Sequence, residues 1–141
     1  MEKIYILGIK ELSTWASNFE DDRIVKFVDV PNISTIELEI IDKFIFNTFM
    51  HDDNNNEKAK CIIIDLDVHY PSLMLNIAMH IRLSVEKLKK ISFLPIILVS
   101  YLPIQTFLKL GDCSQIFLSR QGVYFCEPDD VKYAVKECKG L

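Results

Sequence analysis

Two carboxylates follow an apolar run near the middle of the chain. The segment reads Cys61-Ile-Ile-Ile-Asp65-Leu-Asp67 and is closed by Pro71. Such a run is typical of a strand buried on both faces of a parallel sheet, and open α/β sheets bind ligands beyond the carboxyl ends of their strands. Asp65 is therefore a candidate acceptor or the anchor of a polar cluster, or else an ordinary carboxylate that caps the loop. Asp67 is a loop residue or a cation ligand.

The elements that must position these residues alternate between strand and helix. One helical face is marked by apolar residues at i, i+3, i+4 and i+7, namely Leu12, Trp15, Ala16 and Phe19. Ser34 and Glu37 have the spacing of a capping box, which predicts the start of a second helix. Strands are expected at residues 3–8, 24–30, 61–65, 95–100 and 122–126, and helices at 12–19, 35–49, 72–90, 101–110 and 129–139. Because parallel neighbours need crossover helices, this alternation predicts an α/β fold with a five-stranded, doubly wound parallel sheet.

Composition limits the class of protein. With 141 residues, 50% of them hydrophobic, the chain is expected to form one domain, residues 1–141. Its net charge of −4 comes without a basic cluster, so neither nucleic acid nor an anionic membrane is expected as a partner. The four cysteines lack Cys-x-x-Cys spacing and are expected to be free thiols in a reducing cytoplasm. The sequence has no secretory signal, membrane-length run, nucleotide-binding loop or hydrolase motif, so neither an enzyme nor a cofactor is expected.

The carboxyl-terminal part of the chain resembles the receiver domain of bacterial two-component response regulators. The resemblance rests on three segments: Ile62-Ile-Ile-Asp65-Leu before Pro71, Ile96-Ile-Leu-Val-Ser100, and Gly122-Val-Tyr124-Phe-Cys-Glu127-Pro128. It implies a flavodoxin-like fold with strand order 2-1-3-4-5 and puts Asp65 at the phospho-acceptor position. It also makes Ser100 and Tyr124 the switch residues. Ser100 could donate to a phosphoryl oxygen, or it could bond the turn that follows its strand.

Two departures from the family pattern predict that phosphorylation is lost. Where the family has an acidic pair that holds magnesium, this chain reads Gly8-Ile9-Lys10-Glu11, which leaves only Glu11. Where the family has a lysine, this chain has Glu127. Phosphoryl transfer to an aspartate depends on cations that neutralise the transferred group. A carboxylate about 4 Å from that group would instead repel it by roughly 4 kcal/mol at an effective dielectric near 20.

Other arrangements stay open at this stage. Lys10 could supply the missing cation by pairing with Asp65 or Glu127, which would restore an unusual phosphate site. Glu11, Asp65 and Asp67 could hold a divalent cation through waters. The chain would then be either a working receiver that uses Asp65 with magnesium or a flavodoxin-like domain that binds a small molecule.

The favoured hypothesis is a pseudo-receiver that acts as a protein-interaction module in two-component-type signalling and is not an enzyme. In the family that the chain resembles, the fourth helix, fifth strand and fifth helix form a face that mediates contacts with partners. The corresponding interface residues here are Tyr101, Phe107, Tyr124 and Tyr133. Aromatic side chains suit such a face because they bury a large area at little entropic cost. A protein partner is expected, and a homodimer through this face is one form that it could take.

Overall fold

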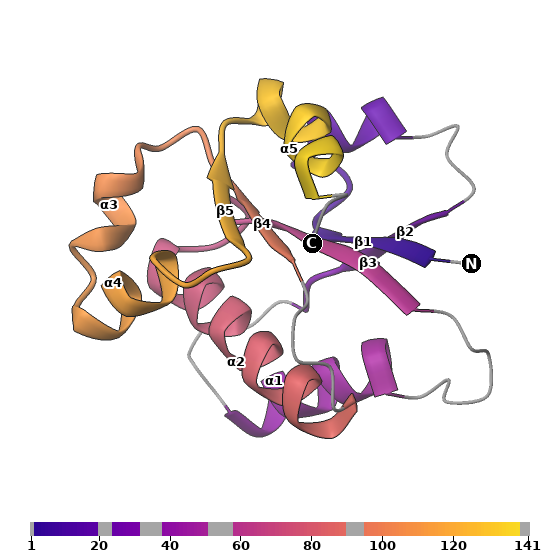
Figure 1. The fold of residues 1–141 in the computed structure, drawn as a ribbon, viewed down its shortest axis with the longest axis horizontal. Helices are drawn as coiled ribbons and strands as arrows, with labels where there is room; N and C mark the ends of the chain where they lie inside the picture. Colours follow the sequence, from indigo (N-terminus) through magenta and orange to yellow (C-terminus); the bar gives the residue numbers. More distant parts are fainter. Residues whose placement is uncertain (1, 20–23, 32–37, 51–57, 90–94, 139–141) are drawn as a thin grey trace.

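The computed structural model describes residues 2–19, 24–31, 38–50, 58–89 and 95–138. In these ranges, five parallel strands form one sheet: β1 (Glu2–Gly8), β2 (Val25–Asp29), β3 (Lys58–Asp65), β4 (Ile96–Val99) and β5 (Val123–Cys126). Their order across the sheet is β2-β1-β3-β4-β5 (Figure 1). This order confirms the predicted α/β fold with the flavodoxin-like arrangement 2-1-3-4-5.

Helices lie on both faces of this sheet, with η1 and α5 on one side and α1 and α2 on the other (Figure 1). In chain order the helical elements are η1 (Thr14–Phe19), α1 (Leu38–Ile45), η2 (Phe46–Met50), α2 (Pro71–Lys89), α3 (Ile104–Leu108), α4 (Asp112–Leu118), η3 (Pro128–Asp130) and α5 (Val131–Glu137). Among the described residues, no helix is long and apolar enough to cross a membrane.

Two of the predicted helices differ from those observed. The first is a six-residue 3₁₀ helix, η1, and Leu12 lies before it with 58% of its side chain exposed. The reason is a tight turn after β1, in which the amides of Leu12 and Ser13 both donate to the carbonyl of Ile9. The region predicted as one helix at 101–110 contains α3 and is followed by the unexpected α4, with Gly111 between them at φ 139°. The Ser34–Glu37 capping box lies outside the described residues.

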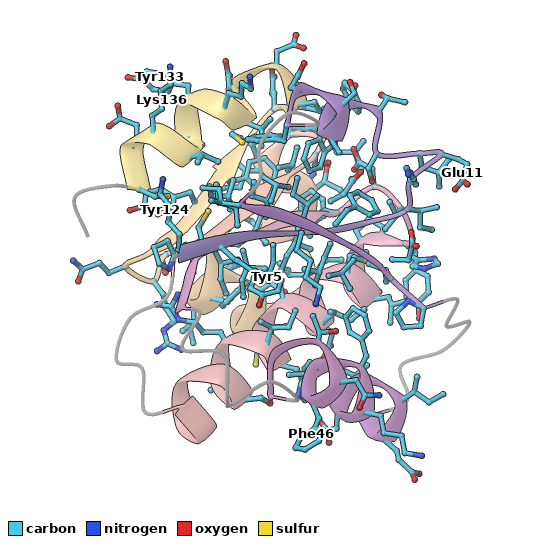
Figure 2. All side chains as sticks on the ribbon, turned by 90° about the vertical axis from the view of Figure 1, so that its right-hand side faces the viewer. Tyr5, Glu11, Phe46, Tyr124, Tyr133 and Lys136 are labelled. Atoms are coloured by element: carbon cyan, nitrogen blue, oxygen red, sulfur yellow. The ribbon has the colours of Figure 1, made fainter. Side chains whose placement is uncertain are left out.

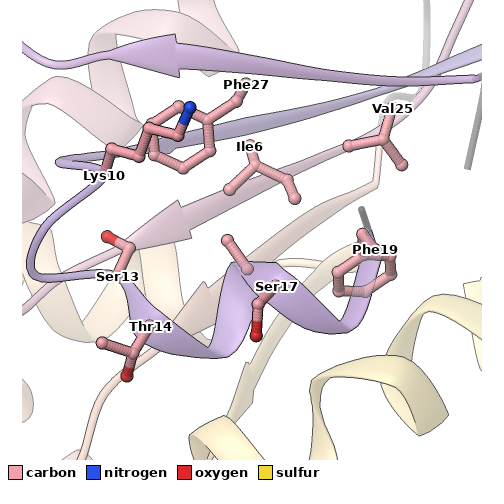
Figure 3. A pocket seen from close by; sticks show the side chains of 9 residues that line it. Ile6, Lys10, Ser13, Thr14, Ser17, Phe19, Val25 and Phe27 are labelled. Carbon is pink, nitrogen blue, oxygen red and sulfur yellow. The ribbon is translucent and has the colours of Figure 1, made fainter. Parts of the chain in front are cut away.

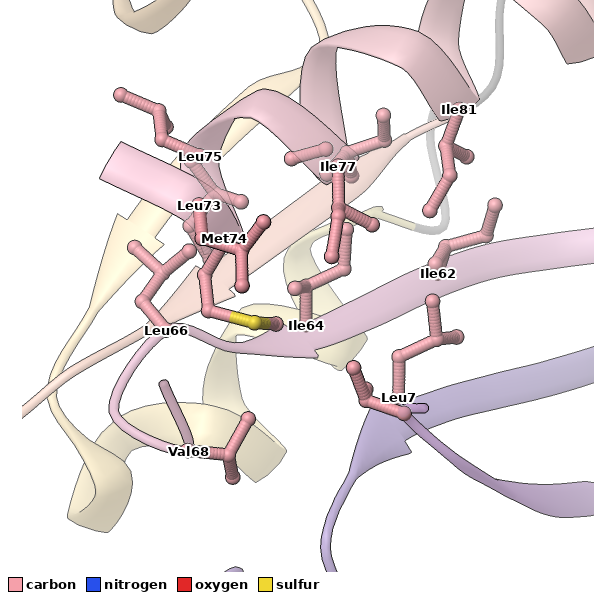
Figure 4. Close-up of a cluster of buried hydrophobic side chains, with 14 of the residues drawn as sticks. Leu7, Ile62, Ile64, Leu66, Val68, Leu73, Met74, Leu75, Ile77 and Ile81 are labelled. Atoms are coloured by element: carbon pink, nitrogen blue, oxygen red, sulfur yellow. The ribbon is translucent and has the colours of Figure 1, made fainter. Parts of the chain in front are cut away.

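Alternating side chains of the strands face two separate cores. On β3, Ile62 and Ile64 face the core that α1 and α2 cover, whereas Cys61 and Ile63 face the core that η1 and α5 cover. Figure 4 shows the first core, where side chains of α2 pack against β1 and β3. Burying one such aliphatic side chain contributes about 1.5–3 kcal/mol. The central strand that ends at Asp65 is therefore held from both sides.

The register of the strands lines up the carboxyl ends of β1, β3 and β4. Leu7 pairs with Ile64, and Asp65 pairs with Val99. The segments that leave these strands, which contain Ser13, Asp67 and Ser100, therefore begin at the same edge of the sheet. That edge is where a parallel α/β sheet places its functional groups.

Phe107 does not lie on an exposed interaction face, and its assignment to the interface is wrong. Its side chain is 0% exposed, and its ring packs against Phe125 with 5.5 Å between the centroids. Phe107 belongs to the same core as the side chains of α2, because α3 turns this residue toward the sheet.

We expect Phe107→Ala to lower the free energy of unfolding by about 3–5 kcal/mol, because it leaves a cavity in the core. The matched control is Tyr101→Ala. Tyr101 is 71% exposed, so removing its side chain should change the free energy of unfolding by no more than about 0.5 kcal/mol. Urea denaturation of both variants measures the difference. Equal effects of the two substitutions would contradict the burial of Phe107.

Candidate functional site

Asp65 is buried at the end of β3, and both of its carboxylate oxygens have partners. Its side chain is 3% exposed. Oδ2 accepts a hydrogen bond of 2.6 Å from the Ser13 hydroxyl, and Oδ1 accepts one of 2.9 Å from the backbone amide of Asp67. The position that the sequence singled out as an acceptor is thus the anchor of a polar cluster.

The cluster depends on Ser13, which was not identified from the sequence. Ser13 is 2% exposed, and its hydroxyl also accepts a hydrogen bond of 3.2 Å from the amide of Ile9. The space for this side chain exists because residue 8 is glycine. A Cβ at Gly8 would overlap the Ser13 hydroxyl and would lie 3.1 Å from the Ser13 Cβ. A glycine in a strand often marks a close approach of another part of the chain, so Gly8 was the feature of the sequence from which a close neighbour could have been predicted.

The pKa of Asp65 is raised above its ordinary value. Burial is the main cause, and the nearby Asp67 carboxylate adds to it. Hydrogen bonds from Ser13, from the Asp67 amide and from Trp15 lower the pKa and offset part of this effect. The fold therefore disfavours the ionised form of Asp65, which is the form that would be needed to accept a phosphoryl group.

Asp67 and Ser100 join the loop after β3 to the loop after β4. The Ser100 hydroxyl donates to Asp67 Oδ1 at 2.6 Å, and the amide of Tyr101 donates to Asp67 Oδ2 at 2.8 Å. The Ser100 hydroxyl in turn accepts from the amide of Leu102 at 2.9 Å. We call these three hydrogen bonds the Asp67 clamp. Ser100 is completely buried, whereas Asp67 is exposed.

Ser100 thus bonds the turn that follows its strand, which was the second of its two expected roles. Its hydroxyl also donates to Asp67, a partner that the sequence did not predict. The Ser100 hydroxyl therefore already has a hydrogen-bond acceptor within the chain, the Asp67 carboxylate.

The carboxylates expected to share a divalent cation are not gathered into a site. Among the described residues, no group of three or more His, Cys, Asp or Glu side chains could hold a metal ion. The physical reason is that Asp65 is turned toward Ser13, and Asp67 toward Ser100 and the Tyr101 amide. Glu11 is exposed at the outer edge of the molecule (Figure 2). These side chains do not fit a magnesium site.

Lys10 and Glu127 are not among the partners of Asp65. Lys10 is exposed and borders a hollow next to Phe27 (Figure 3), and within the described residues it forms no ion pair with Asp65 or Glu127. Glu127 is exposed just before η3. The groups that act on the pKa of Asp65 do not include either of them.

Tyr124 is half-buried beneath α5 (Figure 2). Burial is the main cause that raises its pKa, and the charges of Cys138 and Glu137 contribute to the increase. In the part of the chain that the structure describes, no hydrogen bond links its hydroxyl to Ser100. Tyr124 pairs with Ile97, three residues before Ser100, so the two expected switch residues are not opposite each other in the sheet and are not directly bonded.

Comparison with known protein families gives a match over most of the chain. The model of a family described as Inactive Receiver domain (iREC) matches residues 11–126. This range includes Ser13, Asp65, Asp67 and Ser100. No curated protein and no solved structure matches the chain significantly.

The raised pKa of Asp65 predicts how stability depends on pH. In the unfolded chain an aspartate titrates near 3.9, so the folded state holds this proton to higher pH than the unfolded state. The contribution of Asp65 to stability is therefore present below about pH 3.9 and is lost as the pH rises through the folded pKa. We expect Asp65→Asn to become more stable relative to the wild type as the pH rises from 4 to 7.

Urea unfolding of both proteins across this range measures the change, with Asp29→Asn, at the exposed end of β2, as the control. A constant offset between Asp65→Asn and the wild type would leave the prediction unsupported. A difference that runs the opposite way with pH would contradict it.

Proposed function

This chain belongs to the inactive receiver domain family, and we propose that it serves as a protein-interaction module in two-component-type signalling, independent of phosphorylation. The observation that carries the proposal is the hydrogen bond from Ser100 to Asp67. In the receiver domains that the chain resembles, the hydroxyl at this position responds to the phosphoryl group. Here it already donates to a carboxylate of the same chain, at 2.6 Å.

The acceptor position supports the loss of phosphorylation. A nucleophilic carboxylate has to be ionised and reachable, but Asp65 is 3% exposed, has both oxygens bonded and has a raised pKa. The Asp67 carboxylate adds negative charge next to Asp65, where a phosphoryl group would need cations. These features favour a domain with no catalytic activity and no cofactor.

The Asp67 clamp orders the segment that a partner would meet. It holds the backbone amides of Tyr101 and Leu102, while their side chains are 71% and 43% exposed. In a working receiver, the loop after β4 would adopt its ordered conformation only after a phosphoryl group had been added. Here a resident carboxylate accepts the hydrogen bonds, so the loop takes one arrangement without modification.

Apolar side chains are also exposed on the elements that flank β5 in the chain. Leu110 follows α3, Ile116 lies on α4, and Tyr133 lies on the outer side of α5 (Figure 2). Aromatic and large apolar residues are the usual anchors of protein interfaces. We place the interface on these residues together with Tyr101, with the half-buried Tyr124 at its margin, and a second copy of the chain is the partner to test first.

The rest of the chain fits a cytoplasmic regulator. Cys61, Cys113, Cys126 and Cys138 are free thiols, and burial raises the pKa of Cys61 to about 12 and that of Cys126 to about 11. Buried thiols with a raised pKa, such as those of Cys61 and Cys126, are unreactive, and free cysteines are typical of a reducing compartment.

Phosphorylation is tested by incubating the protein with acetyl phosphate and magnesium and measuring its mass. We expect no phosphoryl adduct, because Asp65 is enclosed and, among the described residues, no cationic side chain is bonded to it. A working receiver of known activity, treated in parallel, is the positive control. A phosphoryl adduct that disappears in Asp65→Asn would overturn the proposal.

The interface is tested by sedimentation equilibrium over a wide range of protein concentration. We expect the wild type to form a dimer, and the double variant Tyr101→Ser/Ile116→Ser to dissociate at least about tenfold more readily, since both residues are anchors. Leu83→Ser on α2 is the matched control, because Leu83 is 59% exposed and is not one of the proposed interface residues. A wild type that is monomeric at every concentration would contradict the homodimer.

A further inference from the structure

A hollow of about 690 Å³ lies between η1 and the strands β1 and β2 (Figure 3). Its floor includes Ile6, Val25 and Phe27, and Lys10 and Ser17 border it. The volume falls in the range of about 300–1,000 Å³ that is usual for small-molecule sites. The hollow is separate from the Asp67 clamp, to which it contributes no residue.

The hollow exists because η1 is short. A 3₁₀ helix rises about 2.0 Å per residue, and η1 has six residues, Thr14–Phe19. Its buried side chains, Trp15 and Phe19, pack in the core with residues of β1 and β3. Little of the helix remains to cover β2, the edge strand, so Val25 and Phe27 stay only half-buried.

The lining combines a flat apolar floor with a single cation. Phe27, Val25 and Ile6 offer carbon surface, and among the described lining residues Lys10 is the only charged one. The hydroxyl of Ser13 is engaged by Asp65 and the Ile9 amide, so it does not compete for a ligand. A ligand that matches this lining has an apolar face and one negative charge.

We propose that this hollow binds a planar apolar molecule that carries one anionic group, such as an aromatic carboxylate. The ring system lies on Phe27 and Val25, and the carboxylate pairs with Lys10. The inference does not depend on the proposed interaction role, because the two use different residues on different elements.

The test uses 2-naphthoate, with 2-naphthalenemethanol as its uncharged counterpart, titrated into ¹⁵N-labelled protein. We expect saturable shifts of the amides of β1, η1 and β2, with naphthoate bound about fivefold more tightly than the alcohol, as one exposed ion pair would give. Lys10→Gln should abolish this preference. Lys109→Gln, which removes another exposed lysine beyond the hollow, should leave it unchanged.

Filling the hollow gives the second arm. Ala16→Leu and Ser17→Leu each add bulk to the lining, and each should weaken naphthoate at least about tenfold. Ser17 is exposed, so Ser17→Leu should fold, and its affinity for naphthoate can be measured even if Ala16→Leu fails to fold. Shifts that never saturate, shifts outside β1, η1 and β2, or equal binding of the acid and the alcohol would each overturn the proposal.

Discussion

The carboxylate of Asp67 accepts hydrogen bonds from the Ser100 hydroxyl and the Tyr101 amide at the start of the loop after β4, and the arrangement of this edge of the sheet depends on that interaction. Ser100 is completely buried, so its hydroxyl needs an acceptor within the protein. Asp67 provides it and uses its second oxygen for the amide of Tyr101. Hydrogen bonds to a charged acceptor are shorter and stronger than neutral ones. Within the described residues, the Ser100 hydroxyl and the Tyr101 amide therefore already have an acceptor that belongs to the chain itself.

A second polar cluster closes the neighbouring strand end. Asp65 is enclosed by Ser13, and Ser13 fits only because Gly8 has no side chain. The two clusters are joined through the backbone amide of Asp67, which donates to Asp65 while its carboxylate accepts from Ser100. Membership of the inactive receiver family is thus matched by a physical cause. The Asp65 carboxylate is turned inward, and Asp67, two residues later, accepts the hydrogen bonds of the loop after β4.

The sheet could be predicted from the sequence because the buried strands have a clear pattern of residues. The runs at 61–65 and 95–100 are aliphatic and end in polar residues, and the structure confirms them as β3 and β4. The clusters were harder to predict, since Ser13 and Asp65 are 52 residues apart and no local pattern links them. Phe107 was assigned to the exposed side from the interaction face of the family that the chain resembles, whereas the short helix α3 turns its side chain into the core. The Asp67–Ser100 contact joins two loops whose relative position is set only by the register of β3 and β4.

Amide hydrogen exchange at Tyr101 and Leu102 tests the Asp67 clamp most directly. The structure predicts that both amides are protected in the wild type and that Asp67→Ala speeds exchange at Tyr101 by about tenfold, the equivalent of one lost hydrogen bond. The Leu102 amide donates to the Ser100 hydroxyl, so its exchange speeds up to a smaller extent, because Ser100 loses its acceptor. Asp42→Ala, which removes an exposed carboxylate from α1, should leave both rates unchanged. If Tyr101 and Leu102 exchange at the same rate with and without the Asp67 carboxylate, the clamp does not hold this loop.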